Sequence, residues 1–199
     1  DEKFLAEYHD TLAAFDEYMA NGSDHWFARK YGAKLDGPIA YFCAEYGVHE
    51  SLGIYSGGLG VLAGDHMKSA SDMALPLIGV GLLYRKGYFR QQIDADGHQE
   101  HNYPDYDLNR LPLSRVQDRN GLPMTVTVEL PGRDLSVAVW LAQVGRGPLL
   151  LLAPDAAENA VAELDAKRKQ IDGFSITAPQ SNAYFTQTIA ALLAVASEI

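Results

Sequence analysis

Three closely spaced glycines, Gly57, Gly58 and Gly60, are the residues best placed to do chemistry in this sequence. Apolar residues at helical spacing begin directly after them, which predicts that a helix starts here. The first N–H groups of a helix have no intrahelical acceptor, and together with the helix dipole they favour an anion. Because glycine has no Cβ, the oxygens of that anion can approach the backbone closely. The pattern therefore predicts an anion-binding helix start.

Two known nucleotide-binding patterns were compared with these glycines, and neither is well supported. Residues 58–63 fit the dinucleotide pattern G-x-G-x-x-G/A, but a long loop separates them from the preceding strand. The following strand ends in Leu83-Tyr84-Arg85-Lys86 and lacks the acidic residue that would bind a ribose. The sequence also has no Gly-Lys-Ser/Thr, so a Walker-type phosphate loop is excluded. Taken alone, the residues leave anion binding and close helix–sheet packing equally open.

Two apolar runs and a helix must position the glycines. Residues 39–44 and 75–83 resemble buried strands, and the helix-period run between them extends to Met73. Strand, loop, helix and strand form the unit of a parallel α/β sheet. Further along, residues 124–130 and 135–141 alternate in polarity and residues 149–152 form a buried run, which predicts an antiparallel hairpin extension. The expected fold class is therefore α/β with a mixed sheet flanked by helices.

The N-terminal segment predicts two helices. Apolar residues recur at helical spacing from Phe4 to Met19, and Asn21-Gly22 ends the pattern. A second, short helix is expected to run to Tyr31 and to end at Gly32. We expect both helices to pack against the sheet.

Polar residues between the first strand and the glycines are candidates for a site, because parallel sheets bind ligands at the carboxyl ends of their strands. Glu45 and Glu50 could position a hydroxyl or a water, although capping of the loop is the favoured role. His66 either faces the site or lies at the surface, and the latter is the commoner situation. The run from His98 to His101 lacks the four ligands of a structural zinc site, so a solvated turn and no metal are expected.

Composition excludes several kinds of partner. The chain has 16 basic and 26 acidic residues and a net charge of −10, which argues against nucleic acid and anionic membranes. No apolar run approaches the ~20 residues of a membrane span, and no signal peptide is visible, so a cytoplasmic location is expected. The single cysteine, Cys43, excludes an intrachain disulfide and is expected to be buried in the first strand.

Three consecutive runs resemble the N-terminal domain of bacterial α-glucan (glycogen/maltodextrin) phosphorylases. They are AYFCAEYGVHES at residues 40–51, YSGGLGVLAGDH at 55–66 and GVGLLYRKGYFRQ at 79–91. The resemblance covers residues 1–160, and residues 161–199 are expected to form a helical tail that does not match the family. Fold and function follow as expectations: a Rossmann-like half of a two-domain GT-B type glycosyltransferase that transfers the terminal glucose of an α-1,4-glucan to inorganic phosphate, giving glucose 1-phosphate.

The resemblance also implies site residues and a cofactor. Ser56, Gly57, Gly58 and Leu59 match the family's glycine loop, whose backbone amides face the phosphate, and Glu45 and Tyr46 match the loop beside the pyridoxal phosphate pocket. The lysine that binds pyridoxal phosphate belongs to the C-terminal catalytic domain of the family. No lysine of this chain lies in a motif like Gly-Thr-Gly-Asn-Met-Lys, and no catalytic residue is assigned.

The chain alone is therefore expected to be an inactive N-terminal piece of the enzyme. Its expected partners are the α-1,4-glucan, inorganic phosphate and the C-terminal domain, and homo-oligomerisation is left open. Two alternatives stay open as well. One is a short, non-catalytic module that binds glucan, phosphate or another protein, and the other is a glucan synthase that uses a nucleotide sugar.

Overall fold

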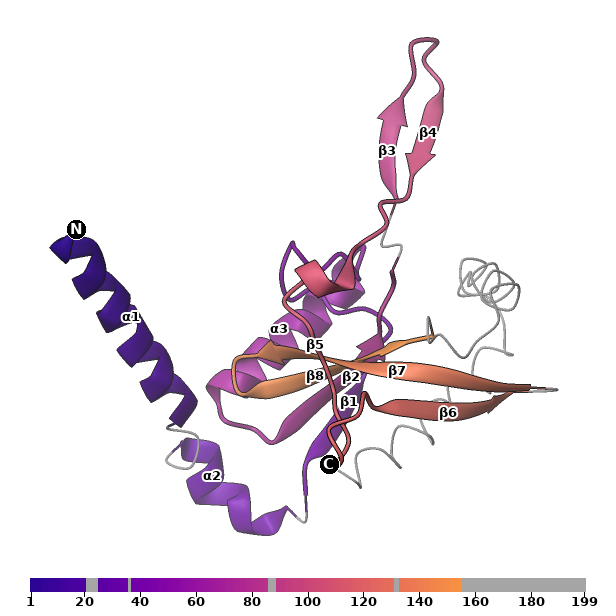
Figure 1. The fold of residues 1–199 in the computed structure, drawn as a ribbon. Coiled ribbons are helices and arrows are strands. Elements are labelled where there is room, and N and C mark those ends of the chain that lie inside the picture. Colours follow the sequence, from indigo (N-terminus) through magenta and orange to yellow (C-terminus); the bar gives the residue numbers. More distant parts are fainter. Residues whose placement is uncertain (21–24, 36, 86–88, 131–132, 155–199) are drawn as a thin grey trace.

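The computed structural model describes residues 1–20, 25–35, 37–85, 89–130 and 133–154 (Figure 1). The elements in chain order are α1 (Glu2–Ala20), α2 (Trp26–Tyr31), η2 (Gly32–Lys34), β1 (Ile39–Phe42), α3 (Gly58–Asp72), β2 (Leu77–Leu82), β3 (Arg90–Ile93), β4 (Gln99–Asn102), η3 (Leu108–Arg110), β5 (Ser114–Arg115), β6 (Thr125–Leu130), β7 (Arg133–Val144) and β8 (Gly147–Ala153). None of the helices in these ranges is long and apolar enough to cross a bilayer. The expected helical tail at 161–199 lies outside the described residues.

One six-stranded mixed sheet forms the centre of the fold, with the order β1-β2-β8-β7-β5 and with β6 also paired to β7. Strands β1, β2 and β8 are parallel, with Ile39 opposite Leu77 and Gly79 opposite Leu149. Strand β7 runs antiparallel to β5, β6 and β8. The predicted mixed α/β sheet with an antiparallel extension is confirmed. In addition, β8 belongs to both parts, because it pairs with β2 on one side and with β7 on the other.

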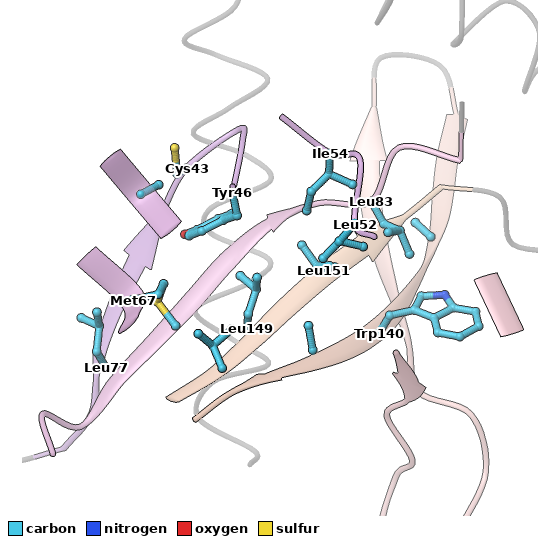
Figure 2. Packing of buried hydrophobic residues seen from close by; sticks show 14 of the residues in the cluster. Cys43, Tyr46, Leu52, Ile54, Met67, Leu77, Leu83, Trp140, Leu149 and Leu151 are labelled. Carbon is cyan, nitrogen blue, oxygen red and sulfur yellow. The ribbon is translucent and has the colours of Figure 1, made fainter. Parts of the chain in front are cut away.

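Helix α3 covers one face of this sheet. Its buried residues include Ala63, Met67 and Ala70, which pack with Tyr46, Leu149 and Leu151 in one core cluster (Figure 2). Strand β2 contributes glycines to this face: a Cβ at Gly79 would press on the Met67 sulfur, and one at Gly81 would press on the Tyr46 ring. These glycines let α3 and the loop before it lie directly on the strand.

The opposite face of the sheet has its own apolar cluster. Its buried members are Val80, Val128, Val137, Val139, Leu150 and Leu152. Along β2 and β8, neighbouring residues alternate between the two clusters, as side chains of successive strand residues point to opposite faces. Cys43 is buried in the α3-side cluster, as expected, but it lies one residue beyond the end of β1 and not within the strand.

The prediction that both N-terminal helices pack against the sheet is wrong. The expected helix over residues 2–20 is present, but α1 has no buried residue and stands away from the sheet (Figure 1). Phe4 is 64% and Phe15 is 55% exposed, and α2 likewise has no buried residue. The physical reason is geometric: within the described residues, α1 is held through Tyr18 in its last turn, by the end of α3 and the β7–β8 turn, and the rest of its apolar stripe extends away from the sheet.

Tyr18 fastens α1 to the end of α3 and to the turn between β7 and β8. Its hydroxyl lies 2.6 Å from Ser71 Oγ and donates to Asp72 Oδ1 at 3.0 Å. The Arg146 guanidinium lies over its ring, 3.8 Å from the ring centroid. Arg146 also donates to Ser71, from its backbone N–H to Oγ and from Nη1 to the carbonyl. This cluster, Tyr18–Ser71–Arg146, is the attachment point of α1 in the described part of the chain.

Candidate functional site

The glycines before α3 form the helix start that the sequence predicts. Gly57 is the N-cap residue, its backbone is extended, and no side chain caps the helix. The first backbone bond of the helix is donated by the Val61 N–H to the Gly57 carbonyl, at 3.2 Å. The N–H groups that precede it have no intrahelical acceptor. The predicted helix start is confirmed, and anion binding there stays a prediction.

The glycines of this segment divide into two pairs with different roles. A Cβ added at Gly57 or Gly58 would meet nothing within 4 Å. A Cβ at Gly60 would overlap the Tyr55 side chain, and one at Gly64 would overlap the Gly47 carbonyl oxygen. Close packing thus accounts for Gly60 and Gly64 but not for Gly57 and Gly58, whose exposed backbone is free to meet a ligand.

The loop between β1 and α3 lies against the first turns of the helix. The Gly47 N–H donates to the Gly60 carbonyl at 2.7 Å, and the Gly47 carbonyl lies against Gly64. Since Gly60 and Gly64 are one turn apart, they present a flat strip of helix backbone to the loop. This contact fixes the position of Glu45, two residues earlier, relative to the start of α3.

Glu45 was predicted for the loop beside the cofactor pocket and Ser56 for the glycine loop, and the structure connects them by hydrogen bonds. The Glu45 carboxylate accepts from the Ser56 backbone N–H at 3.2 Å and from Ser56 Oγ at 3.4 Å. A carboxylate near a helix N-terminus is electrostatically favourable. The pair therefore holds the chain in a defined conformation just before Gly57, and we call residues 56–59 with Glu45 the glycine turn. Leu59 is 54% exposed within it.

Tyr46 has a clear structural position. Its side chain is fully buried, and its hydroxyl donates to the Tyr41 carbonyl at 2.6 Å and accepts from the Val80 N–H at 3.2 Å. The ring thereby holds β1 and β2 together beneath the loop. A role in the cofactor pocket stays a prediction, and it would fall to the main chain of Tyr46.

Sequence reasoning missed Tyr84, which lies beside the glycine turn. Its hydroxyl donates to the Ala44 carbonyl at 3.2 Å. Burial and, secondarily, the negative charge of Glu45 raise the pKa of Tyr84 to about 12. The signal was its place just beyond β2, because parallel neighbours β1 and β2 end at the same edge of the sheet.

The buried Tyr46 and the half-buried Tyr84 predict alkaline instability. Burial raises the pKa of Tyr46 as well as that of Tyr84, whereas unfolded tyrosine titrates near 10. The folded state therefore holds both hydroxyl protons more tightly than the unfolded state. The contribution of Tyr84 to the free energy of unfolding is complete below pH ~10 and is lost between ~10 and ~12, and that of Tyr46 also begins to fall above pH ~10. We expect the free energy of unfolding to fall by up to about 1.4 kcal/mol per pH unit for each tyrosine in this window.

Urea unfolding at stepwise pH measures how steeply the free energy of unfolding falls with pH. The Tyr84→Phe variant should show a smaller slope of free energy against pH than the parent chain. An unchanged slope in Tyr84→Phe would contradict the assignment.

The remaining predicted polar residues lie outside the glycine turn. Glu50 and His49 are exposed, and the His49 Nδ1 accepts from the Ser51 backbone N–H at 3.1 Å. His66 is exposed on α3, with its ring 4.7 Å from the Tyr41 ring. Of the two positions predicted for His66, facing the site or lying at the surface, the surface position is confirmed.

The β3–β4 hairpin projects from the sheet (Figure 1) and contains a small cluster of polar side chains. Ligand atoms of Asp94, Asp96 and His98 lie within 4.8 Å of one another. However, Asp94 Oδ1 accepts the backbone N–H groups of Asp96 and His98, and these hydrogen bonds close a turn in which Gly97 has a positive φ. His101 is not part of this group and pairs with Gln99 instead. The hydrogen bonds of the turn account for the proximity of these side chains.

Comparison with protein families shows which class of protein the chain resembles. The model of the family described as carbohydrate phosphorylase matches residues 45–130, the segment that contains Glu45, the glycine turn and Tyr84. A second model, described as a protein of unknown function (DUF3417), matches residues 1–52. The central part of the chain is thus similar in sequence to carbohydrate phosphorylases.

Individual relatives narrow the class to α-glucan phosphorylases. The chain is 50% identical to a glycogen phosphorylase of Mycobacterium tuberculosis, over 74% of this chain and 18% of the relative. It is 39% identical to a maltodextrin phosphorylase of Thermococcus litoralis, over 85% of this chain and 22% of the relative. A glycogen phosphorylase of Aquifex aeolicus is 36% identical, with 80% and 22% covered. The predicted relationship is confirmed, and the chain spans about a fifth of the length of these relatives.

Proposed function

We propose that the chain is the N-terminal part of an α-glucan phosphorylase and that its glycine turn binds phosphate during phosphorolysis. In this proposal the sheet is the Rossmann-like half of a two-domain GT-B type enzyme, and a C-terminal domain completes the active site. The reaction transfers the terminal glucose of an α-1,4-glucan to inorganic phosphate. The observation that supports it is the open, uncapped start of α3 at Gly57 and Gly58.

The geometry suits an anion that must be held without rearrangement. Backbone N–H groups at a helix start are fixed dipoles, so they stabilise negative charge at no reorganisation cost. Glu45 holds the Ser56 backbone, and the Gly47–Gly60 hydrogen bond holds the loop on the helix. The Ser56 hydroxyl belongs to the turn, and it can rotate from Glu45 toward a bound oxygen.

Pyridoxal phosphate is the cofactor that the family relationship implies, and its phosphate would supply the proton-transferring group beside the substrate phosphate. The uncapped glycine turn fits an anionic group of this kind. Lys68 on α3 does not fit the covalent attachment of pyridoxal phosphate at the turn, because it lies about 15 Å along the helix from Gly58. The covalent lysine would come from the C-terminal domain, and we propose that the 199-residue chain alone is inactive.

The test is a Gly58→Val substitution in the complete enzyme, with glucose 1-phosphate release from maltodextrin as the readout. Since a Cβ at Gly58 meets nothing within 4 Å, the variant should remain folded while its added side chain occupies the approach to the N–H groups. We expect the KM for phosphate to rise by about tenfold or more, because a charge-assisted bond to the backbone is lost.

Ser69→Val is the matched control, since Ser69 is exposed on the same helix and lies away from the glycine turn. It should leave the KM for phosphate unchanged and reproduce any general effect of valine on the helix. Equal KM values in the two variants would contradict phosphate binding at the turn. Glucan that lengthens with a nucleotide sugar, and does not shorten with phosphate, would instead identify a synthase.

A further inference from the structure

A hollow that is lined by none of the glycine-turn residues lies where α3, the 48–52 loop, η3 and the end of β7 meet. Its volume is about 720 Å³, which is in the range of small-molecule sites. The lining residues are Val48, His49, Ser51, Leu52, Lys68, Arg110, Leu111, Pro112, Ala142, Gln143, Val144 and Gly145. Each of the four segments contributes, so the hollow depends on the tertiary fold.

The charged residues that line the hollow are all basic. Lys68 comes from α3 and Arg110 from the end of η3, and within the described residues no carboxylate lines the hollow. Neither of these two cations has an ion pair with a described residue. In a chain of net charge −10, two cations that share one hollow without a carboxylate create a local positive potential.

The remaining lining combines an apolar floor with polar donors at the rim. Leu52, Ala142 and Val144 are buried and face the hollow. At the rim, the backbone N–H of Ser51 donates to His49 Nδ1, so a neutral imidazole bears its proton on Nε2 and can donate there. Gln143 donates its amide N–H to the Gly145 carbonyl, which leaves its amide oxygen as an acceptor.

We propose that this hollow binds a small organic phosphate, with the phosphate on Lys68 and Arg110 and an apolar or ring-shaped body on the floor. Arginine recognises phosphate through paired N–H groups, and lysine adds a point charge. The apolar floor distinguishes such a ligand from inorganic phosphate, which has no surface to bury there.

This site is separate from the glycine turn. Lys68 lies ten residues after Gly58 on α3, which corresponds to about 15 Å along the helix. The glycine turn uses backbone N–H groups, whereas the hollow uses side-chain cations, so substitutions can address each site alone. The proposal does not depend on the proposed phosphorolysis.

The experiment is calorimetric titration of the full 199-residue chain with phenyl phosphate, together with Lys68→Gln and Arg110→Gln variants. Both side chains are exposed, so these variants should unfold at the same temperature as the parent chain. We expect the parent to bind phenyl phosphate and each variant to bind it at least about tenfold more weakly, because each loses a charge-assisted contact. Inorganic phosphate and phenol should each bind more weakly than phenyl phosphate to the parent.

Arg119→Gln is the matched control for the change in net charge, since Arg119 is exposed in the 118–122 turn and does not line the hollow. It should bind phenyl phosphate like the parent. The proposal is overturned if the parent does not bind the probe, or if Arg119→Gln weakens binding as much as Lys68→Gln. It is also overturned if Gly58→Val abolishes binding while the Lys68 and Arg110 variants keep it, because the ligand would then occupy the glycine turn.

Discussion

Replacing Gly64 by alanine is expected to destabilise the chain by about 3 kcal/mol or more, the upper range for overpacking a core. The added Cβ would overlap the carbonyl oxygen of Gly47, a backbone atom that cannot rotate away. Gly64 is buried, so the loop and the helix would have to separate, and the Gly47–Gly60 hydrogen bond would be strained or lost. Equilibrium urea unfolding followed by circular dichroism measures the loss.

Gly58→Ala is the matched control on the same helix. Its Cβ meets nothing within 4 Å, so the change should be neutral or stabilising by less than about 1 kcal/mol, as alanine favours a helix over glycine. If both variants lost similar stability, close packing at Gly64 would not be the cause. A stable Gly64→Ala variant would show that the loop does not lie on α3.

Replacing Gly145 by alanine is expected to cost about 3–5 kcal/mol, because left-handed strain and overpacking add at this position. Gly145 has a φ of +57° in the turn between β7 and β8. Its Cβ would overlap Ser71 Oγ and lie 2.7 Å from the Tyr18 hydroxyl oxygen. Urea unfolding gives the global loss, and hydrogen exchange of the α1 amides should show that α1 detaches first.

Gly121→Ala separates the two contributions. Gly121 also has a positive φ, +78°, but a Cβ there meets nothing within 4 Å. The Gly121→Ala variant should lose about 1–2 kcal/mol of unfolding free energy, which is the cost of left-handed backbone strain alone. Equal losses of unfolding free energy in Gly121→Ala and Gly145→Ala would mean that overlap with the Tyr18–Ser71–Arg146 cluster does not add to the destabilisation.

The elements could be predicted because their signals are local. Apolar runs and alternation located β1, β2, β6, β7 and β8 to within a few residues, and helical spacing located α1 and α3. The dipeptides Asp96-Gly97 and Asn120-Gly121 are local turn signals, and both glycines have a positive φ. Glu45 and Ser56 were both selected as site residues, but their hydrogen bonds depend on how the loop folds back, which no local pattern reports.

Which glycines are open and which are packed could not be predicted either, because this also depends on how the loop folds back on the helix. Gly57 and Gly60 look equivalent in sequence, and only the position of Tyr55 shows that one is open and the other packed. The exposed stripe of α1 is a second case, since periodicity shows that a helix has an apolar face but not what that face meets. Lys68 and Arg110 are far apart in sequence, so their common hollow is a tertiary property.

The position of β8 has a consequence for how the protein is made. The strand that fills the middle of the sheet, between β2 and β7, comes last among the described strands. During synthesis β1 and β2 emerge first, and the edge of β2 that later pairs with Leu149 and Leu151 stays open until β8 leaves the ribosome. Such distant pairing slows folding and leaves an apolar edge exposed. A nascent chain paused before Gly147 should therefore be a chaperone substrate, and one paused well after Ala153 should not.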